Sequence, residues 1–442
     1  MDDKYATLLE TCKQVLADNQ RGNYTVPAEG LYPHQWLWDS CFIAIGLAHY
    51  DIERAKKEIL SLLRGQWANG MLPNMIFADG DQNKQDHNMW QSKRSAFAPD
   101  SFYTSGITQP PMLAEAIVSI GKKLPKEERR KWYQTVYPAL IAYHEWLYIE
   151  RDPHEEGLVL LIHPWECGLD NTPPWIHQLR QHHTPWWVGI VEKTHLDIVA
   201  NIFRRDTARI PPGQRISNIE ALLYYDVIRR LRRKRWDIDS ILSRSHFAIQ
   251  DLTFNCILLR AHDHVHTIAR SIGHEVPELL NERARLGRHA ITEKLWDAFS
   301  GQFYSRNFVT HKLIKEPSIA TLMPLYAGVS NEAQTASLLG LIKSHDNFAT
   351  AFPLPTVPVS YSWYSELKYW QGPTWINTNW LIANGLERQG LSEHAAAIYD
   401  SSIKLVATSG CFEYFSAKTG EPAGAKNFSW SAALIIDMLN KS

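Results

Sequence analysis

Net charge is almost absent from this 442-residue sequence, in which 46 Lys and Arg residues face 47 Asp and Glu residues and leave a formal charge of −1. Proteins that bind nucleic acid through its phosphates carry a clear excess of basic residues, so the balance argues against such a partner. Cysteine is scarce too. The five cysteines form no CxxC pair and lie far apart, at Cys12, Cys41, Cys167, Cys256 and Cys411. This pattern argues against a disulfide framework or a structural zinc site and fits a reducing compartment.

Long apolar runs are missing as well. No stretch reaches the roughly 18 apolar residues of a membrane span, and no apolar segment follows the Met1–Lys4 start, where a signal peptide would lie. We also find no glycine-rich phosphate loop, no Gly-x-Ser-x-Gly elbow and no Cys/His nucleophile arrangement. The sequence thus predicts a soluble, cytoplasmic protein that binds no membrane, and it leaves the oligomeric state open.

Helical periodicity is the main signal that is present. The composition, 45% apolar and 21% charged, is ordinary for a globular protein. Apolar residues recur at spacings of three and four. One predicted helix ends at His49 with Asp39 or Ser40 as its N-cap, and Asp51 caps the next, which runs to Gln66. The other predicted helices cover 3–19, 109–122, 126–151, 187–205, 218–233, 238–247, 251–272, 275–299, 318–326, 331–344, 374–388, 392–408 and 427–440.

Strand signals are few, and the best are 157–162 and 301–305. Long loops recur at 65–108, 153–185 and 345–373, and loops of such length tend to be functional. Helices that alternate with short turns on one side and long aromatic loops on the other predict two concentric rings of antiparallel helices. We therefore predict one α-toroidal domain over residues 1–442, with the long loops at one end.

The segment 163–175 (His-Pro-Trp-Glu-Cys-Gly-Leu-Asp-Asn-Thr-Pro-Pro-Trp) combines two acids, two tryptophans and three prolines. Proline lacks the amide hydrogen and pushes the preceding residue to extended geometry, so we predict a loop. Tryptophan faces can stack on a sugar while carboxyl groups move protons. The alternative is a packed connection in which Asp170 holds a neighbouring backbone amide. This segment alone favours neither interpretation.

Hydrolysis of a glycosidic bond needs two acids on opposite sides of the sugar. Most of the 47 acidic residues must be solvated surface charges. The informative ones lie in aromatic loops: Asp39, Glu166, Asp170, Glu366 and Glu413. Glu413 stands between two aromatic residues, which can desolvate its carboxylate and suit it to proton transfer. The alternative is a strand-like hairpin that points Glu413 to solvent.

A further aromatic cluster covers 361–364 (Tyr-Ser-Trp-Tyr) and 369–375 (Tyr-Trp-Gln-Gly-Pro-Thr-Trp). Gly372 allows a close approach of the backbone, and Gln371 can recognise sugar hydroxyls. The alternative is hydrophobic stapling at the start of a helix.

Four motifs in this order carry a resemblance to a known family: Trp36-x-Trp38-Asp39, Gly168-Leu169-Asp170-Asn171, Trp370-Gln371-Gly372-Pro373-Thr374-Trp375 and Phe412-Glu413-Tyr414. Together they resemble glycoside hydrolase family 63, and within it the small bacterial members similar to mannosylglycerate and glucosylglycerate hydrolases. The resemblance covers nearly the whole chain. It implies an all-α (α/α)6 barrel and an inverting mechanism that needs no cofactor.

The resemblance also implies roles for single residues. Asp170 is expected to be the general acid and Glu413 the general base. The residues expected to line the glycone subsite are Tyr32, Trp36, Asp39, Gln109, Trp370, Gln371 and Trp375. A glycerate carboxylate is expected to meet an arginine fork at Arg204 and Arg205, with Arg215 close by in sequence. The alternative for Arg204 and Arg205 is a basic helix C-terminus that offsets the helix dipole.

Two other groups receive structural interpretations. Glu166 ranks below Asp170 and is expected to support the loop rather than react. His262, His264 and His266 invite a metal site, since positions four apart share a helix face, but spacing places no third ligand. A helix with partly buried histidines is the commoner arrangement, and we predict no metal.

The predicted function is that of an inverting glycosidase acting on a small α-linked glycoside, with 2-O-α-mannosylglycerate or glucosylglycerate as the leading substrate. One alternative is an α-glucosidase or trehalase-like hydrolase of α-linked oligosaccharides. Others are a sugar epimerase or lyase on the same toroid, and a non-catalytic carbohydrate-binding protein. The segment 163–167 departs from the family's usual, more polar lead-in, so the resemblance indicates the reaction class more firmly than the substrate.

Overall fold

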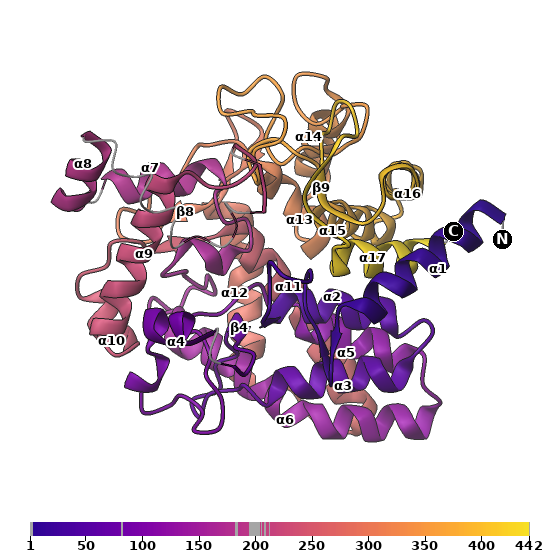
Figure 1. Cartoon of the computed structure of the whole chain (residues 1–442), viewed down its shortest axis with the longest axis horizontal. Helices are drawn as coiled ribbons and strands as arrows, with labels where there is room; N and C mark the ends of the chain where they lie inside the picture. Colours follow the sequence, from indigo (N-terminus) through magenta and orange to yellow (C-terminus); the bar gives the residue numbers. More distant parts are fainter. Residues whose placement is uncertain are drawn as a thin grey trace.

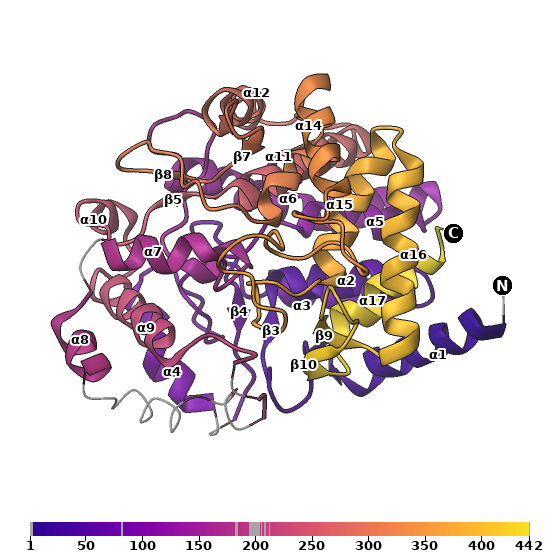
Figure 2. The ribbon, with the colours of Figure 1, turned by 90° about the horizontal axis from the view of Figure 1, so that it is seen from above.

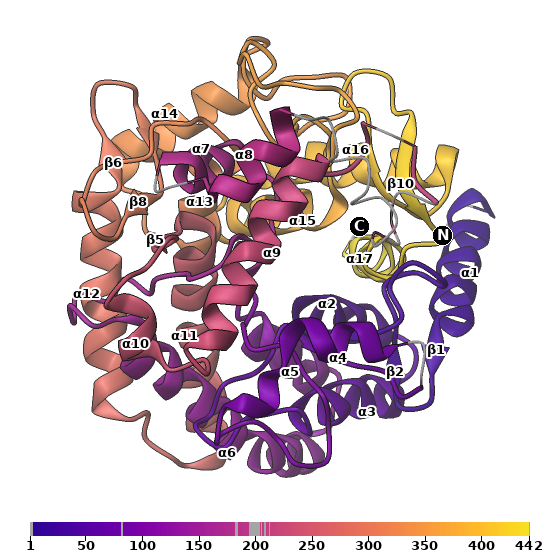
Figure 3. The same ribbon diagram turned by 60° about the vertical axis from the view of Figure 1, so that its left-hand side comes forward.

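A computed structural model describes residues 3–80, 83–181, 184–193, 204, 206, 209–211 and 213–441. Within this part of the chain, six helices pack each against the next, and the last returns to the first, so that they close a ring (Figure 3). Helices that are apolar on all sides belong in a protein interior. Accordingly every residue of the first, fourth and sixth of these helices is buried. In ring order they are α2 (Leu37–Leu47), α5 (Leu113–Lys122), α11 (Leu252–Ile272), α13 (Met323–Ala327), α15 (Ile376–Arg388) and α17 (Ser429–Leu439).

A second set of helices packs outside this ring. Helix α3 shows why: it buries only Ala55, Glu58, Ile59 and Leu62, which form one stripe at helical spacing, and exposes the opposite face. The outer helices are α1 (Asp3–Asp18), α3 (Ile52–Leu63), α6 (Lys126–Arg151), α12 (Glu278–Lys294), α14 (Glu332–Lys343) and α16 (Ser392–Ser409). The predicted all-α class is confirmed, and the inner contacts form the ring expected of an (α/α)6 barrel.

Five further helices of the described chain gather on one side of the ring, at the left in Figures 1 and 2. They are α4 (Lys84–Trp90), α7 (Pro173–Gln181), α8 (Trp186–Lys193), α9 (Asn218–Arg233) and α10 (Ile238–Leu242). The described strands pair antiparallel in twos: β1 (Gln20–Arg21) with β2 (Tyr24–Thr25), β3 (Gln35–Trp36) with β4 (Met75–Ile76), β5 (Ile249–Gln250) with β8 (Arg306–Asn307), β6 (Trp296–Asp297) with β7 (Gln302–Phe303), and β9 (Phe412–Phe415) with β10 (Pro422–Lys426). The β9–β10 hairpin lies beside α16 and α17 (Figure 2). None of the described helices is long and apolar enough to span a membrane.

The start of α2 differs from the prediction. The helix begins at Leu37 and uses no side-chain cap, so Asp39 lies in the first turn. The cause is tertiary: strand β3 pairs with β4 up to the helix, and the Leu37 amide donates to the Asn74 carbonyl at 3.0 Å. The next amide, that of Trp38, donates to the Gln109 side-chain oxygen at 3.5 Å, so partners from elsewhere in the chain bind the start of the helix. The predicted cap of α3 is confirmed, since Asp51 accepts from the Arg54 amide at 3.0 Å.

Two further predictions of local structure were wrong. The segment 157–162 does not form a strand, because side chains bind its backbone. The Asn255 side chain hydrogen-bonds to both the amide and the carbonyl of Val159, and the Asp152 carboxylate accepts from the amide of Gly157. The segment 163–175 is no continuous loop, because a 3₁₀ helix covers Pro164–Cys167 and α7 starts at Pro173. Proline suits the first turn of a helix, where its missing amide leaves no bond unmade. The predicted helix 187–205 ends outside the described residues.

Candidate active site

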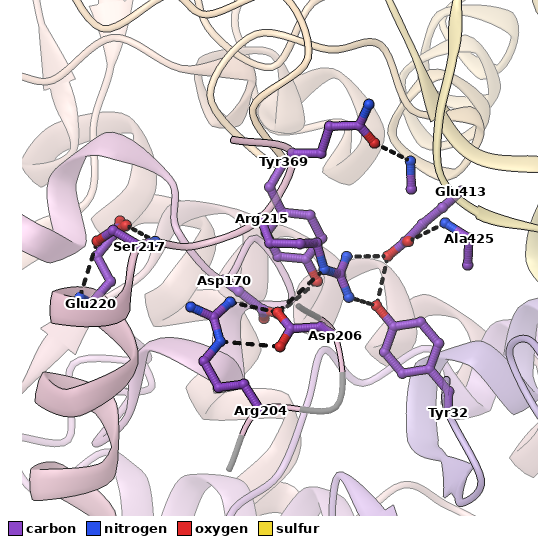
Figure 4. A network of polar contacts seen from close by, with 12 residues as sticks. Tyr32, Asp170, Arg204, Asp206, Arg215, Ser217, Glu220, Tyr369, Glu413 and Ala425 are labelled. Atoms are coloured by element: carbon purple, nitrogen blue, oxygen red, sulfur yellow. Dashed lines mark hydrogen bonds and ion pairs between the residues drawn. The ribbon is translucent and has the colours of Figure 1, made fainter. Parts of the chain in front are cut away.

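The carboxylate of Glu413, in strand β9, is buried and accepts three hydrogen bonds (Figure 4). Its Oε1 accepts from the Tyr32 hydroxyl at 2.8 Å and from the Arg215 guanidinium at 2.9 Å. Its Oε2 accepts from the Ala425 amide at 2.9 Å. The alternative of a hairpin that points Glu413 to solvent is therefore wrong.

A bulge in strand β10 supplies the Ala425 amide. The register of the β9–β10 hairpin shifts between Ala423 and Lys426, and a bulge frees backbone groups from the ladder. Gly424, inside the bulge, has a φ of +72°, and a Cβ there would lie 2.6 Å from Oε2 of Glu413. The position therefore requires glycine.

Asp170 lies in the turn before α7, and two tyrosines bind it. The Tyr369 hydroxyl donates to its Oδ2 at 3.0 Å, and the Tyr224 hydroxyl donates to its backbone carbonyl at 2.5 Å. Burial raises the pKa of Asp170 to about 7, against the opposing effects of the Tyr369 hydrogen bond and the Arg215 charge, while the Glu413 charge adds to the rise. The side chain still keeps partial exposure.

Arg215 connects these two acids (Figure 4). Its guanidinium pairs with Glu413, contacts the Tyr32 hydroxyl and lies 4.4 Å from the centre of the Tyr369 ring, the ring whose hydroxyl binds Asp170. Only 9% of its side chain is exposed. The site therefore holds a buried cation between two carboxyl groups.

Arg204 reaches the same network through Asp206, whose Oδ2 lies 3.7 Å from Nε of Arg215 (Figure 4). The guanidinium of Arg204 makes two contacts with Asp206, at 3.1 and 2.5 Å, and one with Asn218 at 2.9 Å. Arg205 lies outside the described residues. That Arg204 and Arg205 bind substrate stays a prediction, whereas the structure puts Arg215 in the network.

The aromatic wall is built from 369–375 and the hairpin. Trp370 stacks on Trp375 at 3.6 Å with an interplanar angle of 6°, and Tyr414 stacks on Trp375 at 4.6 Å. Trp375 is fully buried between them, and its indole N–H donates to the Tyr369 carbonyl at 3.1 Å. Trp370 and Tyr414 are buried as well, so in this structure the three rings form a packed stack with Trp375 at its centre.

Several buried polar atoms near this wall have no hydrogen-bond partner in the described part of the chain. They are the indole N–H groups of Trp36, Trp370 and Trp430 and the side-chain oxygen of Gln371. Similar atoms occur elsewhere in the described chain, and those beside the wall are donors and acceptors that sugar hydroxyls could satisfy.

Asp39 belongs to the same region. It is 4% exposed, and burial raises its pKa well above the usual range, an effect to which the charges of Glu413 and Asp170 add. No side chain among the described residues hydrogen-bonds to its carboxyl group, which leaves it available to sugar hydroxyls. Gln109 has a supporting contact, because its side-chain oxygen lies 3.5 Å from the Trp38 amide, in the first turn of α2.

Glu166, the other acid of the segment, is a structural residue, as predicted. It is fully buried and pairs with both terminal nitrogens of Arg151, at 2.9 and 3.1 Å. It also accepts from the amides of Thr108 and Ile162. A carboxylate with this many partners anchors the loop that carries Asp170.

The histidines of α11 show no metal site. The Nε2 atoms of His262 and His266 lie 3.1 Å apart, while His264 pairs with Glu115. In the part of the chain that is described, no group of three or more His, Cys, Asp or Glu side chains could hold an ion.

Comparison with known proteins gives matches over nearly the whole chain. Residues 32–431 match a family model described as the mannosylglycerate hydrolase MGH1-like glycoside hydrolase domain. The chain is 35% identical over 426 residues to the mannosylglycerate hydrolase of Thermus thermophilus, with 96% of this chain and 98% of that protein covered. It is 29% identical over 452 residues to the glucosylglycerate hydrolase of Mycolicibacterium hassiacum, with 96% of each covered. A crystal structure of a family 63 mannosylglycerate hydrolase from Thermus thermophilus in complex with Tris and D-glycerate has a TM-score of 0.85 at 33% identity and covers 97% of this chain and 99% of its own.

Proposed function

Because this chain belongs to the mannosylglycerate hydrolase MGH1-like family of glycoside hydrolases, in glycoside hydrolase family 63, we propose that it hydrolyses a 2-O-α-glycosylglycerate with inversion at the anomeric carbon. The chain is a glycosidase, like its relatives. Those relatives are named for mannosylglycerate or glucosylglycerate, so the glycone of the proposal is mannose or glucose. Family membership sets aside the alternative of a protein that only binds carbohydrate.

The observation that carries this proposal is the presence of two carboxyl groups with different partners within one network. The pKa of Asp170 is about 7, so a large share of this group is protonated near neutral pH. Glu413 forms an ion pair with Arg215. An acid that holds its proton beside a second, ion-paired carboxylate is the combination that inverting hydrolysis needs.

In the proposed mechanism Asp170 donates its proton to the glycosidic oxygen as the bond to the anomeric carbon breaks. A water molecule attacks the opposite face of that carbon, and Glu413 takes up its proton. One proton leaves the acid and one reaches the base, so the charges balance, and exchange with solvent restores the site. Ala425 and Tyr32 hold the two oxygens of Glu413 toward the water.

The glycone is proposed to lie at the edge of the aromatic wall, against the partly exposed Trp36. The unpartnered indole N–H groups of Trp36 and Trp370, the oxygen of Gln371 and the carboxyl group of Asp39 supply donors and acceptors for its hydroxyls. Trp375 lies at the centre of this wall. The alternation of polar tips and aromatic faces fits a sugar ring, which has hydroxyls at its rim and C–H groups on its faces.

The carboxylate of the glycerate is proposed to bind Arg215. Both described arginines of this region have protein partners: Arg204 binds Asp206 and Asn218, whereas Arg215 binds Glu413, Tyr32 and Asp206. Arg215 is the described arginine that lies beside both proposed catalytic acids. A buried guanidinium recognises a carboxylate through two parallel hydrogen bonds.

For the compartment we propose the cytoplasm, a proposal supported by five cysteines that are all free thiols.

The experiment is activity of Asp170→Asn and Glu413→Gln on two substrates. On a glycosylglycerate, both variants should lose about 10²- to 10⁴-fold in kcat, the usual contribution of general acid–base catalysis. An α-glycosyl fluoride needs no protonation of its leaving group, so Asp170→Asn should keep activity on it and Glu413→Gln should not. NMR of the first product should show the β anomer.

The matched control is Glu366→Gln, which removes a carboxylate from another aromatic loop, where it accepts from the Ser416 hydroxyl. Its activity should stay near that of the wild type. Near wild-type turnover of glycosylglycerate by Asp170→Asn or Glu413→Gln, or an α-configured first product, would overturn the assignment.

A further inference from the structure

The bulge of strand β10 binds more than the proposed base. One of its amides, that of Ala425, donates to Oε2 of Glu413 at 2.9 Å. The preceding amide, that of Gly424, points to the other side and donates to Oε1 of Gln214 at 3.2 Å. Gln214 directly precedes Arg215 in the chain. Two successive amides of the bulge therefore bind Glu413, the proposed base, and Gln214, the residue next to Arg215.

A second contact holds the backbone of Gln214. The hydroxyl of Tyr414, in strand β9, donates to the Gln214 carbonyl. The hairpin thus binds Gln214 from both of its strands. Beyond these contacts, the amide of Gln214 donates to the Pro211 carbonyl at 3.2 Å, and Ser217 begins the capping box of α9.

These contacts form a closed circuit. It runs from Glu413 through Ala425 and Gly424 to Gln214, then along the chain to Arg215 and back to Glu413. Arg215 has a long side chain, and its contacts with Glu413 and the Tyr369 ring need its Cα at a fixed place. The bond between Gln214 and the bulge fixes that place relative to the base.

We propose that Gln214 is a positioning residue, which holds Arg215 where its guanidinium can bind an anionic aglycone. The inference rests on the proposed function, in which Arg215 binds the glycerate carboxylate. The side chain of Gln214 itself touches neither catalytic acid and acts through its neighbour. Loss of its bond to Gly424 should therefore harm a charged aglycone more than a neutral one.

The test is Gln214→Met, which keeps the length of the side chain and removes the acceptor. The readout is the ratio of kcat/KM for glycosylglycerate to kcat/KM for the matching glycosylglycerol, whose leaving group needs the same protonation but carries no carboxylate. One hydrogen bond of this kind is expected to change the ratio about three- to tenfold. The change should come from a higher KM for glycosylglycerate, with a smaller effect on kcat.

Gln389→Met is the matched control. The Gln389 side chain donates to the Leu325 carbonyl at 2.7 Å, at the far end of α15. This variant also loses one side-chain hydrogen bond to the backbone, so it should cost similar thermal stability and leave the substrate ratio unchanged. A general loss of stability in Gln214→Met would lower activity on both substrates together, which separates a structural role from a positioning one.

Arg215→Met separates the inference from the proposed function. If Arg215→Met lowers the ratio strongly and Gln214→Met does not lower it, the positioning role is wrong and the aglycone assignment stands. If Arg215→Met leaves the ratio unchanged, or the wild type does not hydrolyse glycosylglycerate, the proposed function fails and the inference falls with it. A lower ratio in both variants, with Gln389→Met unchanged, supports the proposal.

Discussion

Removal of one oxygen from Tyr369 tests whether Asp170 is the proton donor. The Tyr369 hydroxyl donates to Asp170 Oδ2 at 3.0 Å, and its ring lies 4.4 Å from the Arg215 guanidinium. Tyr369→Phe keeps the ring and its contact with the arginine and removes the hydrogen bond. Because that bond lowers the pKa of Asp170, which is about 7 in the intact site, the substitution should raise it.

The size of the shift follows from the strength of the bond. A hydrogen bond to a charged group contributes about 1.5–3 kcal/mol, and one pKa unit corresponds to about 1.4 kcal/mol. The pKa of Asp170 should therefore rise by about one to two units. A general acid must be protonated to act, so activity falls as the pH rises through its pKa. The alkaline limb should start near pH 7 in the wild type and about one to two units higher in Tyr369→Phe.

The assay is the pH dependence of kcat/KM for a glycosylglycerate, which reports the free enzyme. The glycosyl fluoride serves as a reference, since its hydrolysis needs no acid and should lack the limb assigned to Asp170. Tyr304→Phe is the control substitution, because the Tyr304 hydroxyl binds Ser300, on a turn between β6 and β7. An alkaline limb that stays in place or moves to lower pH in Tyr369→Phe would refute the reasoning.

Two further predictions concern the base and the core below the site. Gly424→Ala puts a Cβ 2.6 Å from Oε2 of Glu413, and a displaced catalytic group can cost about 10²-fold in kcat. Gly22→Ala is the control, because Gly22 has a similar positive φ and no atom lies within 4 Å of the added Cβ. It should lower stability and leave kcat unchanged, and equal kcat values in the two variants would contradict the predicted effect on Glu413. Glu58 is buried beside Ser40, and burial raises its pKa from 4.5 to about 7. Its contribution to stability is complete below about pH 4.5 and is lost as the pH rises through about 7. In Glu58→Gln the Tm should therefore depend less on pH between these two values than in the wild type, which thermal melts can measure. The same pH dependence of the Tm in both proteins would contradict this prediction.

Helices with strong local signals were predictable to the residue. The sequence predicted 126–151 and 218–233, and α6 and α9 have these bounds. The start of α2 was not predictable, because strand pairing with residues some forty positions away fixes where the chain enters the helix and binds its first amide. The same holds for 157–162, where the side chain of Asn255 replaces a neighbouring strand.

The structural role of Glu166 could be predicted from the sequence, and the placement of the arginines could not. Glu166 was expected to be structural, and its pairing with Arg151 confirms that role. Arg204, Arg205 and Arg215 lie within twelve positions in similar polar surroundings. What distinguishes Arg215 is its contact with a carboxylate 198 residues away, and no local pattern encodes a contact at that distance.

The network around Arg215 joins segments that are remote in the chain, with Tyr32 and Glu413 separated by 381 residues. The helices, in contrast, depend on hydrogen bonds between near neighbours. Contacts between remote segments form late in folding, because long loops must close first. Refolding should therefore pass through a stage in which helical circular dichroism has recovered and catalysis has not. Enzyme activity thus reports closure of the whole ring, and it is a more stringent probe of refolding than helix content.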